Sequence, residues 1–198
     1  MNERVYIFKG FERFWHWCQA SLIIFLMLTG FEIHGTYTLF GFGRAVDLHT
    51  IAAWALVGLW VFAIFWNFTT GEWRQYAPTV EKIGALFDYY TRGIFRGEKH
   101  PVHPTPVRKF NSLQRLSYLA ILALVMPLIW ITGWLQLFYG EWERWGFGGL
   151  DLAQVAFGHT FAAFLILIFF IGHVYLATTG RTLTSHIRAM VTGWEEIE

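Results

Sequence analysis

Two histidines occupy one long apolar stretch of the sequence, FGHTFAAFLILIFFIGHVY at positions 157–175. His159 and His173 are 14 residues apart, which in an α-helix is about four turns less about 40°, or about 21 Å along the axis. The spacing predicts that both imidazoles lie on one face of an apolar helix, near its two ends. A polar ring there is costly and indicates a functional site, although a hydrogen bond to a neighbouring helix would also explain either histidine alone.

Four apolar blocks of the sequence predict the helices that position these rings. Hydrophobic residues make up 55% of the 198 residues and charged residues only 15%, whereas about a quarter of a soluble domain is charged. Each block is long enough to cross a hydrocarbon core of about 30 Å as a helix. The blocks lie at about 14–33, 48–67, 114–136 and 153–178. They predict an all-α integral membrane protein, a four-helix bundle that forms one membrane-embedded domain over residues 1–198.

The cysteine count and the net charge exclude other classes of protein. Cys18 is the only cysteine, so the chain holds no internal disulfide and no cysteine-based zinc or iron–sulfur site of its own. A formal net charge of +1 gives no indication of nucleic-acid binding.

The basic residues are distributed unevenly between the connections. Thirteen of the fifteen Lys and Arg residues fall in the N-terminal segment, in the long connection before the third block and at its edge, or in the C-terminal segment; only Arg44 and Arg144 fall in the short connections. Because cytoplasmic loops retain positive charge, we expect both termini and the long connection to be cytoplasmic. Residues 34–47 and 137–152 would then face outward, which in a protein of the bacterial inner membrane is the periplasm.

Two segments outside the blocks have amphipathic patterns. The long connection, PTVEKIGALFDYYTRGIFRGE, predicts a helix over about 79–95 that lies at the inner membrane surface. The tail SHIRAMVTGWEEI could lie there in the same way. Between them, KHPVHPTP is a proline-broken loop with His100 and His103, which could bind a metal ion or, as is commoner, simply be solvated.

Histidines of other blocks can be ordered by depth, because the chain direction alternates from span to span. His16, in RFWHWCQ, and His173 lie at the inner level, whereas His49, in VDLHTIAAW, and His159 lie at the outer level. Two pairs at two depths, each from two helices, are what two bis-histidine haems need. Zinc fits less well, because no cysteine or carboxylate converges at either level.

His34 and three glycines bear on the same haem hypothesis. His34 is 18 residues after His16 on the same face and could replace His49 as a ligand or contact a partner, although FEIHGTY is expected at or beyond a helix end. Gly158 and Gly172 each precede a histidine of the fourth block, and Gly30 could let a macrocycle approach the backbone. Small residues also serve helix packing in membranes.

The histidine pattern resembles a known family. RFWHW at the first block, LH at the second and two histidines 14 residues apart in the fourth are similar to the dihaem cytochrome b subunits of formate dehydrogenases, nickel–iron hydrogenases and thiosulfate-reductase-like complexes. The similarity covers essentially the whole chain. Its formate dehydrogenase branch implies His16 with His173 at an inner haem b, and His49 with His159 at an outer haem b.

The resemblance also implies a quinone site at the start of the third block. RKFNSLQRLSY looks like the family stretch in which Asn111 faces the quinone, with Gln114 and Arg115 close by. Leu113 stands where that branch has a glycine, which affects the expected pose of the quinone ring. Without the family, Asn111 or Ser112 could simply cap the third helix.

These features predict a membrane cytochrome b subunit that relays electrons between the quinone pool and a periplasmic redox partner, an iron–sulfur subunit or a multihaem cytochrome. Apart from the quinone site, no substrate-converting site is apparent. Trp142, Trp145 and Phe147 could contact the partner or form an aromatic girdle. The alternatives are a non-redox membrane anchor and a proton-translocating subunit; the latter usually has acidic residues in mid-membrane, and Glu32 lies near a span end.

Overall fold

Four apolar helices dominate the described part of the chain. The computed structural model describes residues 3–98, 100–102 and 104–197. Within these residues, four helices are long and apolar enough to cross a membrane: Gly10–Ile33, Phe42–Thr70, Ser112–Leu137 and Leu152–Ala177. They confirm the predicted spans and the all-α membrane class. The second helix begins six residues before its predicted start, after Gly41 with its φ of 85°, so His49 lies about two turns inside the helix.

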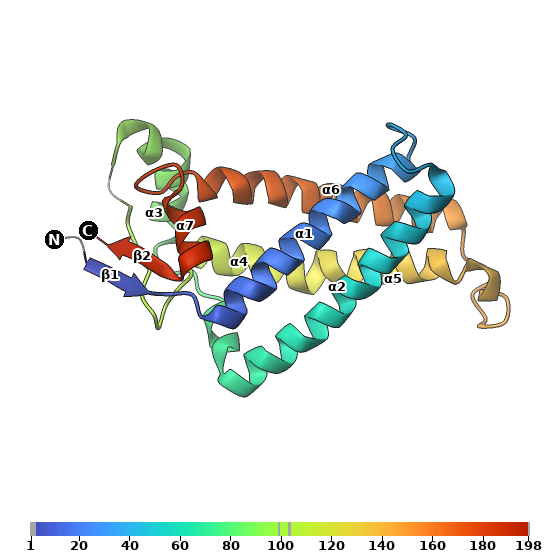
Figure 1. Ribbon diagram of the computed structural model, residues 1–198, viewed down its shortest axis with the longest axis horizontal. Helices are drawn as coiled ribbons and strands as arrows, with labels where there is room; N and C mark the ends of the chain where they lie inside the picture. The colour runs from blue at the N-terminus through green and yellow to red at the C-terminus, as the bar shows by residue number, and fades with distance from the viewer. Residues whose placement is uncertain (1–2, 99, 103, 198) are drawn as a thin grey trace. The chain divides into compact units, whose positions relative to one another are not determined.

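The chain divides into two compact units, whose elements are labelled in Figure 1. The first unit combines Met1–Ala77, His103–Lys109 and Gly180–Glu198, and the second combines Pro78–Val102 with Phe110–Thr179. The first contains β1 (Glu3–Tyr6), α1 (Gly10–Ile33), α2 (Phe42–Thr70), η1 (Glu72–Tyr76), α7 (Ser185–Thr192) and β2 (Trp194–Ile197). The second contains α3 (Ile83–Asp88), η2 (Tyr89–Gly93), η3 (Ile94–Arg96), α4 (Ser112–Ala120), η4 (Ile121–Val125), α5 (Met126–Leu137), η5 (Tyr139–Glu141) and α6 (Leu152–Ala177).

In the first unit, the tail folds back on the start of the chain. The Arg13 guanidinium and the Trp17 indole of α1 donate hydrogen bonds to carbonyls of α7, at 2.6 and 3.1 Å. β1 and β2 then pair antiparallel, from Glu3 with Ile197 to Tyr6 with Trp194 (Figure 1). The sequence analysis did not predict these strands. The tail is therefore a helix of eight residues followed by a strand.

The connection between α1 and α2 is organised by one buried carboxylate. Glu32 is only 4% exposed, and its Oε1 accepts hydrogen bonds from the backbone N–H groups of Leu39, Phe40 and Gly41 at 2.6–2.7 Å. Three donors converging on one oxygen compensate the burial of the carboxylate. This carboxylate therefore fixes the connection between the end of α1 and the start of α2.

In the second unit, the third span contains a π-helical turn. Residues Ile121–Val125 form this turn between α4 and α5, and the Met126 N–H donates to the Ile121 carbonyl five residues earlier. Pro127 follows at the start of α5. Because proline has no N–H and its ring collides with the carbonyl four residues before it, a wider turn here keeps the helix continuous.

The amphipathic helix expected over about 79–95 is present but begins later. Helical structure runs from Ile83 to Arg96 as α3, η2 and η3. Lys82, at the N-cap, has a left-handed φ of 55° and separates this run from Pro78. Leu86 is completely buried, whereas Phe87 is 63% exposed.

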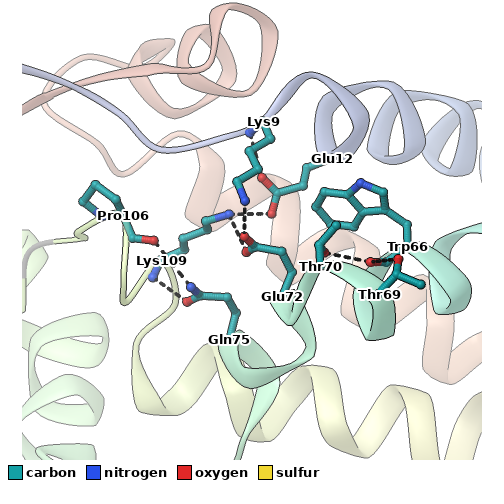
Figure 2. Close-up of polar contacts among 9 residues, drawn as sticks. All are labelled: Lys9, Glu12, Trp66, Thr69, Thr70, Glu72, Gln75, Pro106 and Lys109. Carbon is teal, nitrogen blue, oxygen red and sulfur yellow. Dashed lines mark hydrogen bonds and ion pairs between the residues drawn. The ribbon is translucent and has the colours of Figure 1, made fainter.

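A buried ion cluster attaches residues 104–109 to the helices of the first unit (Figure 2). The Lys109 ammonium, whose side chain is 2% exposed, lies 2.6 Å from Glu12 of α1 and 2.9 Å from Glu72 of η1. Lys9 contacts the other oxygen of Glu72 at 2.5 Å. Gln75 accepts from the Lys109 backbone N–H at 3.1 Å. Two ammonium groups thus balance two carboxylates.

The charges of this cluster shift its pKa values. Burial acts to raise the pKa of Glu72, but the hydrogen bonds and charges of Lys9 and Lys109 outweigh it and lower the pKa below its ordinary 4.5. The hydrogen bond to Glu72 raises the pKa of Lys9 above 10.5, against the effect of burial. The Glu72 contribution to stability is therefore complete above pH 4.5 and is lost as the pH falls through its lowered pKa. The Lys9 contribution is complete below pH 10.5 and is lost as the pH rises through its raised pKa.

Lys109→Met should destabilise the protein by about 3 kcal/mol at pH 7, because it leaves buried carboxylates without their shared cation. The free energy of unfolding, measured in mixed micelles, tests this. The difference in the free energy of unfolding between Lys109→Met and wild type should narrow as the pH falls below 4.5, because Glu72 then becomes protonated and loses its charge. Arg92→Met is the matched control, because the Arg92–Asp88 pair is exposed (71% and 61%) and weak. Equal effects of the two variants would contradict the prediction.

Candidate functional site

His49 of α2 is held by a hydroxyl of α1. Thr29 Oγ lies 2.9 Å from His49 Nδ1, and the same hydroxyl donates to the Phe25 and Leu26 carbonyls of its own helix at 3.0 and 3.2 Å. A hydroxyl has only one proton, and when Thr29 gives it to the Phe25 or Leu26 carbonyl, the hydroxyl can only accept from the imidazole. We therefore assign the Nδ1–H tautomer to His49, with the lone pair on Nε2.

His159 of α6 is held in the same way by α5. Its Nδ1 lies 3.2 Å from Thr132 Oγ and 3.1 Å from the Ile129 carbonyl oxygen. The Thr132 hydroxyl donates to the Leu128 carbonyl at 2.6 Å. A carbonyl oxygen can only accept, so Nδ1 of His159 carries the proton and Nε2 has the lone pair.

A glycine follows each of these threonines and faces the ring, which leaves little room for a Cβ atom at Gly133 but an ordinary contact distance at Gly30. A Cβ atom at Gly30 would lie 3.6 Å from Cε1 of His49, and one at Gly133 would lie 3.1 Å from Cε1 of His159. Gly30 faces the imidazole of His49, and the expected approach of a macrocycle to its backbone stays a prediction. We call Thr29–Gly30 and Thr132–Gly133 the imidazole seats of His49 and His159.

The two imidazole seats repeat one arrangement in the two units. Each histidine is seven residues after the first residue of its helix, and each seat lies on the preceding span. The sequence analysis missed Thr29, Thr132 and Gly133. The signal that could have found them is the repeated Thr-Gly-aromatic triplet, TGF at 29–31 and TGW at 132–134. A metal-bound histidine usually donates its other ring N–H in this manner, which fixes the ring and raises its basicity.

His16 and His173 have aromatic neighbours. The His16 ring meets Trp17 edge-on at 5.1 Å. His173 stacks on Phe169 at 5.8 Å, one turn earlier in α6. Within the second unit, Phe169 contacts Tyr118 at 6.2 Å and Tyr118 contacts Phe110 at 5.2 Å. A continuous series of rings thus connects the start of α4 with His173.

The three residues expected at the quinone site begin α4. Asn111 is its N-cap: its side-chain oxygen accepts from the Gln114 N–H at 3.0 Å, and the Gln114 oxygen accepts from the Asn111 N–H at 2.9 Å. Arg115 Nε donates to the Phe110 carbonyl at 3.0 Å, and Asn111 and Arg115 are 9% and 8% exposed. Asn111 therefore caps the helix, as the alternative reading of the sequence expected. The two cap hydrogen bonds use the side-chain oxygens of Asn111 and Gln114. A quinone role for these residues stays a proposal.

The remaining histidines lie outside the spans. His34 is the C-cap of α1 and is exposed, as its expected place at a helix end implied. His100 belongs to a hydrogen-bonded chain described below, and His103 lies outside the described residues. Among the described residues, no three His, Cys, Asp or Glu side chains are grouped so as to hold a metal ion.

The structure has four apolar helices, and histidines of two of them are hydrogen-bonded through Nδ1 to the preceding span. These are features of a membrane-bound b-type cytochrome. The chain belongs to the prokaryotic cytochrome b561 family, whose model matches residues 7–193. It is 30% identical to "Putative cytochrome YdhU" of Escherichia coli (strain K12), over 98% of this chain and 75% of that protein. It is 24% identical to "Probable Ni/Fe-hydrogenase B-type cytochrome subunit" of Rhodobacter capsulatus, over 96% of this chain and 80% of that protein. No solved structure matches significantly.

Family membership confirms the resemblance seen in the sequence and establishes the broad role of the chain. A b-type cytochrome of the membrane transfers electrons and contains haem b. This role differs from the non-redox anchor and from the proton-translocating subunit considered as alternatives.

On the hypothesis that His49 and His159 ligate haem iron, Thr29→Val and Thr132→Val should each raise the midpoint potential of a haem. The hydroxyl makes the imidazole more basic and so favours ferric iron; loss of a hydrogen bond of about 0.5–1.5 kcal/mol corresponds to about 20–65 mV for one electron. A redox titration of the purified cytochrome measures this. Thr29→Ser should retain the wild-type potential. Thr69→Val is the control, because Thr69 donates only to carbonyls of its own helix among the contacts described; an equal shift in that variant would refute the assignment.

Proposed function

We propose that this cytochrome relays electrons between the quinone pool and a periplasmic redox partner through two bis-histidine haems b. His16 and His173 would ligate the inner haem, and His49 and His159 the outer haem. The observation that carries the proposal is the pair of imidazole seats, which give both outer histidines the tautomer that an iron ligand needs. A bis-histidine haem gains or loses one electron and has no open position for oxygen.

The protein residues contribute ligation and position in this proposal. Thr29 and Thr132 hold the protons of the outer imidazoles on Nδ1, so that Nε2 of each can bind iron. Gly30 and Gly133 allow the rings to lie close to a neighbouring helix. Residues 1–198 would form the single membrane-embedded domain expected from the sequence.

The proposed quinone site lies at the start of α4 and involves Asn111, Gln114 and Arg115. The cap uses the oxygen of Asn111 and leaves its amide nitrogen to donate hydrogen bonds. The ring series from Phe110 to His173 supports this location, because it joins the helix start to a proposed ligand of the inner haem. Electrons and the quinone would thus meet at the inner side of the membrane.

The distribution of basic residues supports cytoplasmic termini and a bacterial inner-membrane location. The relative named as a hydrogenase cytochrome subunit supports the existence of a redox partner. A periplasmic partner would dock on the outer loops. Trp145 and Phe147 are 48% and 46% exposed and suit such a contact. Trp142 does not, because it is 3% exposed and its indole donates to the Leu135 carbonyl at 2.8 Å. An iron–sulfur subunit or a multihaem cytochrome would serve as this partner.

The purified chain should bind two haems b, as measured by the pyridine haemochrome assay. His16→Ala and His173→Ala should each remove the inner haem and spare the outer, because each pair shares one iron. His49→Ala and His159→Ala should each remove the outer haem only.

His186→Ala is the control for these variants, because His186 pairs with Glu195 in the tail at 3.0 Å; it should retain both haems. His34→Ala should also retain both. A colourless wild-type protein would end the proposal. Loss of the outer haem in His34→Ala, but not in His49→Ala, would show that His34 ligates this haem in place of His49.

Asn111→Ser separates the quinone role of this residue from its capping role. Serine caps helices about as well as asparagine, so thermal stability and haem content should stay at wild-type levels. The loss of the amide should slow reduction of the haems by menadiol at least about tenfold, whereas dithionite should reduce them fully. Unchanged kinetics with menadiol would show that Asn111 only caps α4.

A further inference from the structure

A chain of polar side chains beside Asn111 has no part in the electron relay described above. Asn111 Nδ2 donates to the Tyr90 hydroxyl at 3.1 Å, and this hydroxyl lies 3.0 Å from His100 Nε2. All three residues belong to the second unit. Asn111 is 9% exposed, whereas Tyr90 and His100 are half-buried. This series of hydrogen bonds therefore leads from a buried amide towards solvent.

His100 can hold its proton on either nitrogen without losing a hydrogen bond. Its Nδ1 contacts the Val102 carbonyl oxygen and also lies 3.1 Å from the Val102 backbone nitrogen. With the proton on Nδ1, the ring donates to this carbonyl and accepts from the Tyr90 O–H at Nε2. With the proton on Nε2, it donates to Tyr90 and accepts from the Val102 N–H. A proton can thus enter at one nitrogen and leave from the other.

Tyr90 keeps its proton at neutral pH. Burial raises the pKa of its phenol above the ordinary 10.0, and the hydrogen bond from Asn111 only partly opposes this effect. A phenol in this state transfers a proton only when it receives another. Its neighbour His100 is held in place, because the Tyr89 ring meets it edge-on at 4.8 Å and Lys82 donates to the Pro101 carbonyl at 3.3 Å.

We propose that Tyr90 and His100 carry protons between water and the quinone bound at Asn111. The inference rests on the proposed function, which supplies the quinone site and the inner haem as electron acceptor. One N–H of the Asn111 amide donates to Tyr90, and the second can donate to a quinone oxygen. The same amide then places that oxygen beside the Tyr90 hydroxyl. Tyr90 is the catalytic residue of this step, and His100 connects it to solvent.

The proton transfer balances in both directions. In quinol oxidation, the quinol O–H bond breaks and its proton binds to the Tyr90 oxygen, while the Tyr90 proton moves to His100 Nε2. His100 then releases the proton on Nδ1 to water. For each proton that leaves, one electron would pass to a haem held by His16 and His173. Before the second proton follows, the His100 ring must turn so that a nitrogen lone pair again faces Tyr90. Two such steps convert the quinol to the quinone. Quinone reduction reverses every transfer.

The test is anaerobic stopped-flow reduction of the purified two-haem protein by menadiol and by duroquinol. Tyr90→Phe removes the hydroxyl and His100→Ala removes the imidazole; we expect each to slow haem reduction by quinol at least about tenfold. The quinol concentration for half-saturation should change little, because Asn111 still binds the ring. Haem content and reduction by dithionite should match wild type. Added imidazole should restore the rate of His100→Ala.

Tyr89→Phe is the matched control. It keeps the ring that contacts His100 and removes only a hydroxyl that is not part of the Asn111–Tyr90–His100 series. Its rate of haem reduction by quinol should equal that of wild type. If Tyr90→Phe and His100→Ala are as fast as Tyr89→Phe, the proton chain is refuted while the electron relay stands. Slow reduction of His100→Ala that imidazole does not restore would also refute it. If neither quinol reduces the wild-type haems but dithionite does, the proposed quinone link fails and the proton chain with it.

Discussion

The site depends on one neutral hydrogen bond, from an imidazole N–H to a threonine hydroxyl on the neighbouring helix. The threonine gives its own proton to a carbonyl one turn earlier, so it has only an acceptor to offer. That fixes which imidazole nitrogen has the lone pair. The bond also requires the helices to lie close together, which explains the glycine beside Thr132, where a Cβ atom would lie 3.1 Å from the ring. In lipid, where water cannot orient a ring, such a contact determines the chemistry of the histidine.

Much of the fold followed from the sequence, because an apolar run long enough to cross a bilayer has few alternatives to a helix. Most ends of the spans lie within a few residues of those predicted. The starts of α2 and α3 did not follow, since they depend on single residues, Gly41 and Lys82. The two strands were missed because each has four residues and its partner is at the other end of the sequence. Thr29 and Thr132 were missed for a related reason: a lone hydroxyl in an apolar helix gains its role only from the facing helix.

Polar groups are used differently at the imidazole seats and in the ion cluster. At the imidazole seats the contacts are between uncharged groups, whereas the cluster of Lys9, Glu12, Glu72 and Lys109 pairs full charges where α1 begins and just after α2 ends. This division follows from the high cost of charge in hydrocarbon. The chain from Asn111 to His100 lies between these extremes, because it is uncharged yet contains a titratable ring that reaches solvent. Such a chain suits proton movement at a membrane surface.

The pairing of β1 with β2 has a consequence for the order of assembly during synthesis. The first unit takes residues from the beginning, the middle and the last part of the sequence. The ribosome produces α1 and α2 early, but the partner strand for β1 appears only after α6 has been made. Domains with contiguous sequence can fold while translation continues, whereas this unit must wait. All four spans are therefore synthesised before this unit can be completed.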